Sequence, residues 1–348
     1  MRTLSSHYTE AAMTPTLTST LRAGRPRQPG AVAIEAVGLV KKFGDLTAVD
    51  HVGFAVPQGT VLGLLGPNGA GKTTTVRMMT TLSPPTSGTA RVAGYDVRTE
   101  PDKVRRSMGL TGQAATVDEI LTGRENLRMI GGLYGIGRRE LARRSRELLA
   151  QFSLEDAGDK QVKSYSGGMR RRLDLAVSLL AAPPVLFLDE PTTGLDPRSR
   201  SELWGMLRGL VEQGTTLLLT TQYLEEADQL ADNIIVIDKG RVIAEGTPAQ
   251  LKDQAGAASL VLTLTDADDV PAAEALLREA GGDVFVDHTA RRLTTPAEGL
   301  DDLTRVAERL GAHRISVDDI GLARPSLDDV FLSLTGHSAD DDTAREPS

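Results

Sequence analysis

The apolar residues of this chain fall into short continuous runs, separated by longer segments in which they recur at helical spacing. Three runs, at residues 60–65, 185–188 and 216–220, are too short for helices and are bounded by polar or turn residues, which is typical of buried strands. Helical periodicity follows in residues 71–82 and covers most of residues 117–181. Strands that alternate with helices predict an α/β fold with a parallel sheet.

Further extended segments surround this pattern. Residues 33–37 and 46–56 have strand character, and residues 233–244 read as a hairpin with a Lys-Gly turn. We therefore expect a main domain over residues 31–255. The largely helical stretch at about residues 114–181 is expected to form a separate lobe of it.

The remaining third of the chain predicts a second, small domain over residues 256–336. Thr247 followed by Pro248 marks the start of a short helix that ends near the boundary. Beyond it the predicted order is strand, helix, strand, strand, helix, strand, at residues 259–265, 271–279, 283–287, 291–294, 300–310 and 314–318. This order is typical of a ferredoxin-like α+β fold. A last helix, at residues 326–334, is expected to cap this domain.

Composition narrows the function classes. Residues 1–30 and the acidic residues 337–348 lack apolar periodicity, and we expect both to be disordered. The chain has no cysteine, which excludes disulfides and thiolate metal sites, and it contains no apolar run near the roughly 18 residues that span a bilayer. A formal net charge of −8 and 3% aromatic residues argue against nucleic-acid binding.

A glycine-rich loop carries the clearest chemistry. It matches the pattern G-x-x-x-x-G-K-[ST] with Gly66, Pro67, Asn68, Gly69, Ala70, Gly71, Lys72 and Thr73, and Thr74 follows in the predicted helix. The backbone N–H groups of such a loop cradle phosphates at a helix N-terminus, the lysine reaches the terminal phosphates, and the threonine hydroxyl binds Mg²⁺. A chance match is disfavoured because a strand precedes the loop and a helix follows it.

Two carboxylates follow the predicted strand at residues 185–188. Asp189 stands where a carboxylate holds Mg²⁺ in phosphate-loop nucleotidases, and Glu190 is a candidate general base for the attacking water. The alternative is a helix-capping or loop ion pair, which the neighbouring phosphate-loop motif disfavours.

The segment Ser164-Tyr165-Ser166-Gly167-Gly168-Met169 resembles the signature motif of ABC-type ATPases. The resemblance implies that Ser166, Gly167 and Gly168 contact the γ-phosphate of ATP bound to a second copy, in a homodimer. By the same resemblance Gln113 contacts Mg²⁺ and the attacking water, Phe43 stacks on adenine and Asp196 lies in a loop at the dimer interface. Core packing is the alternative for Phe43.

One position departs from the family pattern. After the strand at residues 216–220, where ABC ATPases usually have histidine, this chain has Gln222. An amide can donate a hydrogen bond to a γ-phosphate oxygen, but it cannot take up a proton near neutral pH. More of the catalysis is therefore assigned to Glu190, and the alternative is that Gln222 only holds its loop.

This glutamine variant and the ending Leu327-Asp328-Asp329-Val330-Phe331-Leu332 resemble the ATP-binding subunits of daunorubicin/doxorubicin-resistance-type drug exporters. The resemblance implies a MgATP-hydrolysing peripheral subunit at the cytoplasmic face of the cell membrane, paired with an integral-membrane permease that carries the substrate. The alternatives are an ABC exporter of lipid or polysaccharide, and a non-transport ABC ATPase acting on nucleic acid or ribosomes. The run Arg170-Arg171-Arg172 is read as a charged helix face rather than a nucleic-acid patch, and Trp204 as a packing residue.

Overall fold

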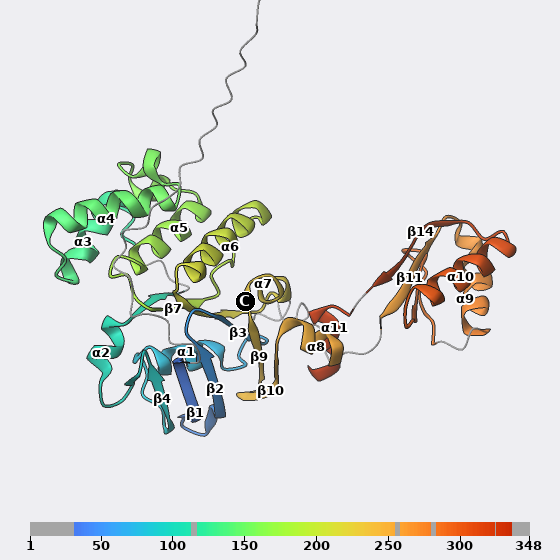
Figure 1. Ribbon diagram of the computed structural model, residues 1–348, viewed down its shortest axis with the longest axis horizontal. Helices are drawn as coiled ribbons and strands as arrows, with labels where there is room; N and C mark the ends of the chain where they lie inside the picture. Colours follow the sequence, from blue (N-terminus) through green and yellow to red (C-terminus); the bar gives the residue numbers. More distant parts are fainter. Residues whose placement is uncertain (1–30, 113–116, 255–257, 280–282, 324, 336–348) are drawn as a thin grey trace, which may run out of the picture.

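The computed structural model describes residues 31–112, 117–254, 258–279, 283–323 and 325–335. We call residues 31–254 the main unit and residues 258–323 the small unit. Figure 1 shows the small unit set apart from the main unit. Among the described residues, no helix combines the length and apolar character needed to cross a membrane.

A largely parallel sheet of six strands forms the centre of the main unit. Its strand order is β10-β9-β3-β8-β7-β6, and only the β9–β10 pair is antiparallel. The strands are β3 (Val61–Leu65), β6 (Met108–Thr111), β7 (Val185–Asp189), β8 (Thr216–Thr221), β9 (Asn233–Asp238) and β10 (Arg241–Gly246). Every residue of β3, β7 and β8 is buried, as their unbroken apolar runs predict.

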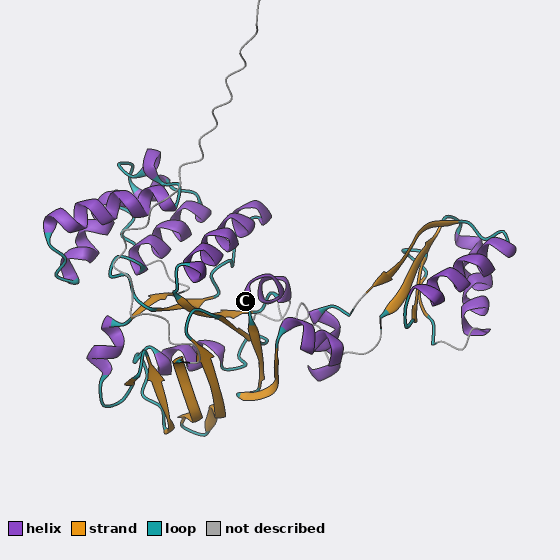
Figure 2. Ribbon diagram, in the orientation of Figure 1, coloured by secondary structure: helices purple, strands orange, loops and turns teal. Residues whose placement is uncertain are grey.

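Successive residues of these strands pack in two different hydrophobic cores, one on each face of the sheet, because side chains alternate across a sheet. In β7, Leu186 and Leu188 pack in one core, whereas Val185 and Phe187 pack in the other. The first core includes side chains of α5 (Gly167–Ser178) and α6 (Pro197–Glu212). The second includes side chains of α1 (Lys72–Met79). The helices α5 and α1 therefore lie on opposite faces of the central sheet (Figure 2).

An antiparallel sheet completes the main unit beside α1. Its order is β2-β1-β4-β5, formed by β1 (Val32–Phe43), β2 (Leu46–Pro57), β4 (Ser87–Val92) and β5 (Tyr95–Asp96), with α2 (Pro101–Arg106) following. The helical segments before α5 are α3 (Gly123–Leu133), α4 (Arg138–Gln151), η1 (Glu155–Ala157) and η2 (Val162–Ser164). Thr122 starts α3 with a capping box that includes Glu125.

The small unit has the predicted ferredoxin-like topology. Its antiparallel sheet has the order β12-β13-β11-β14, and it packs against α9 and α10 over a core of its own. Its elements are β11 (Ser259–Leu264), η3 (Ala267–Asp269), α9 (Val270–Glu279), β12 (Phe285–Asp287), β13 (Arg292–Pro296), α10 (Leu300–Ala312) and β14 (Val317–Ala323). The last strand begins later than the predicted residue 314, because Arg314, with φ of 60°, lies in the turn that ends α10.

The C-terminal helix differs from expectation. Instead of capping the small unit, α11 (Leu327–Thr335) packs against α7 (Leu224–Leu230) and α8 (Pro248–Gln254) of the main unit (Figure 1). Leu327, Val330 and Phe331 are buried in a core shared with both helices and with β3 and β9. Its amphipathic pattern predicts a helix with an apolar face but does not identify the surface that covers that face.

Candidate nucleotide-binding site

The candidate site residues gather at one edge of the central sheet. The glycine-rich loop follows β3, Asp189 ends β7, and Thr220 and Thr221 end β8. These strands are neighbours and parallel. Their carboxyl ends therefore meet at the same edge, which is where open α/β sheets bind ligands.

The loop from Gly66 to Thr73 needs glycine at defined positions. A Cβ atom at Gly66 would collide with the carbonyl oxygen of Ile237. Gly71 has φ of 105°, and a Cβ there would lie 2.5 Å from the carbonyl oxygen of Ala48. Both residues thus allow a tight curl that ends at the N-terminus of α1. Within the loop the structure buries Pro67 and Ala70, exposes Asn68 and Gly69, and leaves Gly71, Thr73 and Thr74 half-buried.

Lys72 lies inside this curl. It is buried, and its Nζ donates hydrogen bonds to the carbonyl oxygens of Gly66 and Pro67 at 2.6 and 3.0 Å. The same Nζ is 3.9 Å from Oε1 of Glu190. Burial lowers the pKa of the Lys72 ammonium, and the charges of Glu190 and Asp189 oppose that shift. An ammonium held at the end of a phosphate-loop motif is suited to donate strong hydrogen bonds to phosphate oxygens.

A candidate metal position joins the loop to β7. The Thr73 hydroxyl donates a hydrogen bond to Oδ1 of Asp189 at 3.1 Å, and the Thr220 hydroxyl donates to the same atom at 2.5 Å. Mg²⁺ prefers a few such oxygen ligands together with phosphate oxygens and water. The donor set of Thr73 and Asp189 therefore fits Mg²⁺. Within the described ranges there is no cluster of three carboxylate, imidazole or thiolate side chains, so any metal here depends on the ligand for its remaining oxygens.

Glu190 has an unusual backbone conformation beside these groups. It is buried, and its φ of 49° lies in the left-handed region that non-glycine residues rarely adopt. Its N–H donates to the carbonyl oxygen of Thr220 at 3.1 Å and to the Thr220 hydroxyl at 3.0 Å. The Thr193 hydroxyl donates to Oε2 of Glu190 at 3.3 Å. Backbone strain of this kind is found at functional sites, where surrounding contacts hold it in place.

The residues of the signature segment lie on the other face of the sheet from the loop helix. Ser166 is the N-cap of α5, and its hydroxyl accepts a hydrogen bond from the backbone N–H of Met169 at 3.2 Å. A Cβ at Gly168 would lie 2.9 Å from the Ser199 hydroxyl of α6, whereas a Cβ at Gly167 would meet nothing. Asp196 caps α6 and accepts two hydrogen bonds from Ser199, which hold the pKa of its carboxyl below the usual range. The helices that follow the signature and the Asp196 loop thus begin side by side.

Phe43 stands at the end of β1 and is 53% exposed, so its side chain does not pack in the core. The Nζ of Lys41 lies 5.0 Å from the ring centroid. An exposed ring face of this kind can stack on a planar ligand.

Gln222 follows β8 and is half-buried, and the ring of Tyr223 beside it is covered by the guanidinium of Arg200 at 4.7 Å. Arg200 also donates to the carbonyl oxygen of Leu195, which directly precedes Asp196. Gln113 lies outside the described residues.

Two charged residues near the site were not singled out by sequence reasoning. Arg171 does not lie on a charged helix face, because its guanidinium points to the backbone at the ends of β6 and β7. Glu226 is fully buried on α7, where burial raises the pKa of its carboxyl, and Nε1 of Trp204 donates to its Oε1 at 3.4 Å. Trp204 is a buried packing residue, as expected. Arg171 lies in a run of three arginines and Glu226 follows another glutamate. Neither sequence pattern distinguishes these residues from charged residues on the surface.

Comparison with known proteins agrees with this geometry. Residues 49–193 match the family model described as ABC transporter. The chain is 53% identical to the daunorubicin resistance ATP-binding protein DrrA2 of Streptomyces coeruleorubidus, covering 90% of this chain and 98% of that protein. It is 38% identical to the Nod factor export ATP-binding protein I of Ralstonia nicotianae, covering 92% and 100%. A solved dimeric ATP-binding cassette with bound ADP and phosphate superposes with a TM-score of 0.56 and 26% identity, covering 62% of this chain and 98% of that one.

Proposed function

The chain belongs to the ATP-binding proteins of ABC transporters, and from this premise we propose that it is the ATPase subunit of a drug exporter. It couples MgATP hydrolysis to efflux of a hydrophobic, drug-like compound through a separate integral-membrane permease, at the cytoplasmic face of the membrane. The observation that carries this proposal is the 53% identity to a daunorubicin resistance protein, which extends over both units and not only the nucleotide site.

In this proposal the site residues divide the work on ATP. The N–H groups of residues 66–73 and the Lys72 ammonium bind the phosphates, and the Phe43 ring stacks on adenine. Thr73 and Asp189 hold Mg²⁺, whose chemistry is to neutralise charge on the phosphate oxygens. Glu190 accepts the proton of the water that attacks in line, and Gln222 donates a hydrogen bond to the γ-phosphate. Gln113 is proposed to orient the same water.

The second half of the ATP site comes from another copy. Ser166, Gly167 and Gly168 begin a helix on the opposite face of the sheet from α1, which supports a homodimer in which they contact ATP held by the partner's loop. A solved relative with ADP and phosphate is itself a dimer, which supports the proposal that this chain pairs with a second copy. ATP then joins the two copies, and hydrolysis lets them separate.

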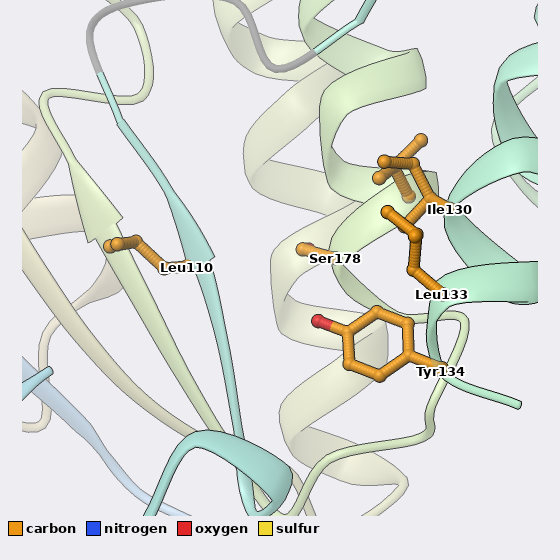
Figure 3. Close-up of a pocket in the computed structure, with 6 residues that line it drawn as sticks. Leu110, Ile130, Leu133, Tyr134 and Ser178 are labelled. Atoms are coloured by element: carbon orange, nitrogen blue, oxygen red, sulfur yellow. The ribbon is translucent and has the colours of Figure 1, made fainter. Parts of the chain in front are cut away.

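A hollow between β6 and the helical lobe suits the permease. It has a volume of about 310 Å³ and lies between Leu110 on β6, Ile130, Leu133 and Tyr134 around the end of α3, and Ser178 on α5 (Figure 3). The side chain of Leu133 is 81% exposed and that of Tyr134 is 46% exposed. Exposed apolar side chains around a hollow are typical of a protein-binding surface. Gln113 follows β6 in the sequence, and this surface is where the nucleotide state is proposed to reach the permease.

The test is to replace Glu190 by glutamine and follow assembly. Glu190→Gln retains the phosphate-binding groups but lacks the base, so gel filtration with MgATP is expected to show a stable dimer with hydrolysis nearly abolished. The double variant Glu190→Gln/Ser166→Arg should stay monomeric with MgATP. The bulky arginine at position 166 is expected to keep the signature segment from approaching the γ-phosphate of ATP held by the other copy. Normal turnover in Glu190→Gln would refute the base assignment. A monomer at saturating ATP, also with the permease present, would refute the shared site.

Export of a different compound is the second candidate, favoured by the 38% identity to a Nod factor export protein over nearly the whole chain. Lipid or polysaccharide is then the substrate class. ATPase activity of the chain reconstituted with its permease separates the two, because only the transported class is expected to stimulate turnover.

A further inference from the structure

One arginine of α5, the helix that begins with Gly167 and Gly168, makes an unusual set of contacts. Arg171 in α5 donates four hydrogen bonds, all to backbone carbonyl oxygens. They go from Nη1 to Gly112 at 2.6 Å, from Nε to Pro191 at 2.8 Å, and from Nη2 to Glu190 at 2.9 Å and Asp189 at 3.1 Å. All three nitrogens of the guanidinium are therefore used on main-chain atoms.

These carbonyls belong to the segments that carry the catalytic side chains. Asp189, Glu190 and Pro191 are consecutive at the end of β7, and Gly112 directly precedes Gln113 in the sequence. The planar fork of an arginine can bind several acceptors in fixed directions, which the single ammonium of lysine cannot do. One side chain thus ties α5 to the ends of two neighbouring strands.

The contact with Glu190 matters because that residue is strained. Its left-handed backbone, with φ of 49°, persists only if its surroundings fix it from more than one direction. Thr220 accepts from the N–H of Glu190, and Arg171 donates to its carbonyl oxygen. The peptide group before the Glu190 side chain is therefore held by both Thr220 of β8 and Arg171 of α5, and the peptide group after it is held by Arg171.

The charge of Arg171 is compensated by acidic groups around it. Burial lowers the pKa of its guanidinium, whereas the charges of Asp174, Glu226, Asp189 and Glu190 oppose that shift. Glu226 comes from α7, which follows the Gln222 loop. The guanidinium is thus held as a cation in a largely enclosed position, where hydrogen bonds from a charged donor are strong.

We infer that Arg171 is a positioning residue for ATP hydrolysis, which holds the Glu190 carboxylate in its catalytic direction and links that direction to the placement of α5. The inference rests on the proposed role of Glu190 as the base. Arg171 itself touches neither the phosphate loop nor Lys72 through any hydrogen bond in the part of the chain that the structure describes. Its loss should therefore affect the chemical step and not the binding of ATP.

Arg171→Lys tests this by separating the two quantities. The variant retains the charge but not the fork, so kcat for ATP hydrolysis should fall about 100-fold, as expected when a catalytic group is misplaced by about 1 Å. KM, and the affinity for a non-hydrolysable ATP analogue measured by calorimetry, should stay at wild-type values. Arg144→Lys is the matched control, because Arg144 donates to the carbonyl oxygen of Leu180 in the helical lobe, away from the site, and turnover should be unchanged.

A double-mutant cycle with Glu190→Gln shows whether Arg171 acts through Glu190. Once the base is gone, adding Arg171→Lys should cause no further loss in single-turnover hydrolysis. Wild-type turnover in Arg171→Lys, or the same fold-loss in both backgrounds, would overturn the inference. If thermal unfolding shows that Arg171→Lys does not fold, Arg171→Gln, which keeps two donors, takes its place in the same cycle. Normal turnover in Glu190→Gln alone would instead overturn the proposed base.

Discussion

At the scale of single residues, some positions of the site require one residue type, and one position differs from the family pattern. Gly66 and Gly71 cannot carry a side chain, and Glu190 has a backbone that only its neighbours maintain. Gln222 stands where the resemblance to ABC ATPases places a histidine. It directly precedes Tyr223, whose ring is covered by the guanidinium of Arg200.

We predict that Gln222 contributes to ATP hydrolysis. Gln222→Ala should lower ATP turnover about tenfold or more, because a hydrogen bond to a charged group contributes roughly 1.5–3 kcal/mol. Gln222→His should retain turnover, since an imidazole N–H can also donate. Steady-state ATPase assays measure both, with Gln213→Ala on the exposed end of α6 as a control. Unchanged turnover in Gln222→Ala would remove any phosphate-sensing role.

At the scale of elements, α11 is the segment whose partner was least expected. It follows the small unit in the chain but buries Leu327, Val330 and Phe331 against α7 and α8. Since α7 begins two residues after Gln222, α11 packs against the helix that follows the Gln222 loop. In the sequence the small unit therefore lies between α8 and α11, two helices that pack against each other on the main unit.

Truncating Phe331 should destabilise the main unit. Phe331 is 2% exposed, so Phe331→Ala is expected to lower the free energy of unfolding by about 3–5 kcal/mol. The chain has one tryptophan, Trp204 on α6, and its fluorescence in urea reports unfolding of the main unit specifically. Phe285→Ala is the control, because that ring on β12 is 73% exposed. An unfolding midpoint that does not move in Phe331→Ala would contradict the packing of α11.

At the scale of the whole molecule, the two units have separate cores. The core of the small unit contains only residues from Leu260 to Leu322, and none of these residues enters the three clusters of the main unit. The nucleotide site lies wholly in the main unit.

Excising the small unit should leave a folded ATP-binding protein. A chain in which a short Gly-Ser linker joins Gln254 to Pro325 keeps α8 and α11 and every core residue of the main unit. We expect wild-type ATP affinity and a Trp204 unfolding transition close to that of the intact chain. A chain that ends at Gln254, and so lacks both the small unit and α11, is the comparison. Its Trp204 unfolding transition should occur at a lower urea concentration. Aggregation of the spliced chain, or loss of its ATP binding, would show that the units depend on each other.

The sequence alone determined the local features. Unbroken apolar runs identified β3, β7 and β8, the glycine-lysine pattern identified the phosphate loop, and alternating elements predicted both folds, because these signals depend on residues close together in the chain. Tertiary structure alone decided where long-range partners lie. The sequence does not show what an arginine in a basic run contacts, nor which surface covers the apolar face of a helix. Only packing turned Arg171 toward the carbonyls of β7 and α11 toward α7, because burial depends on residues distant in the sequence.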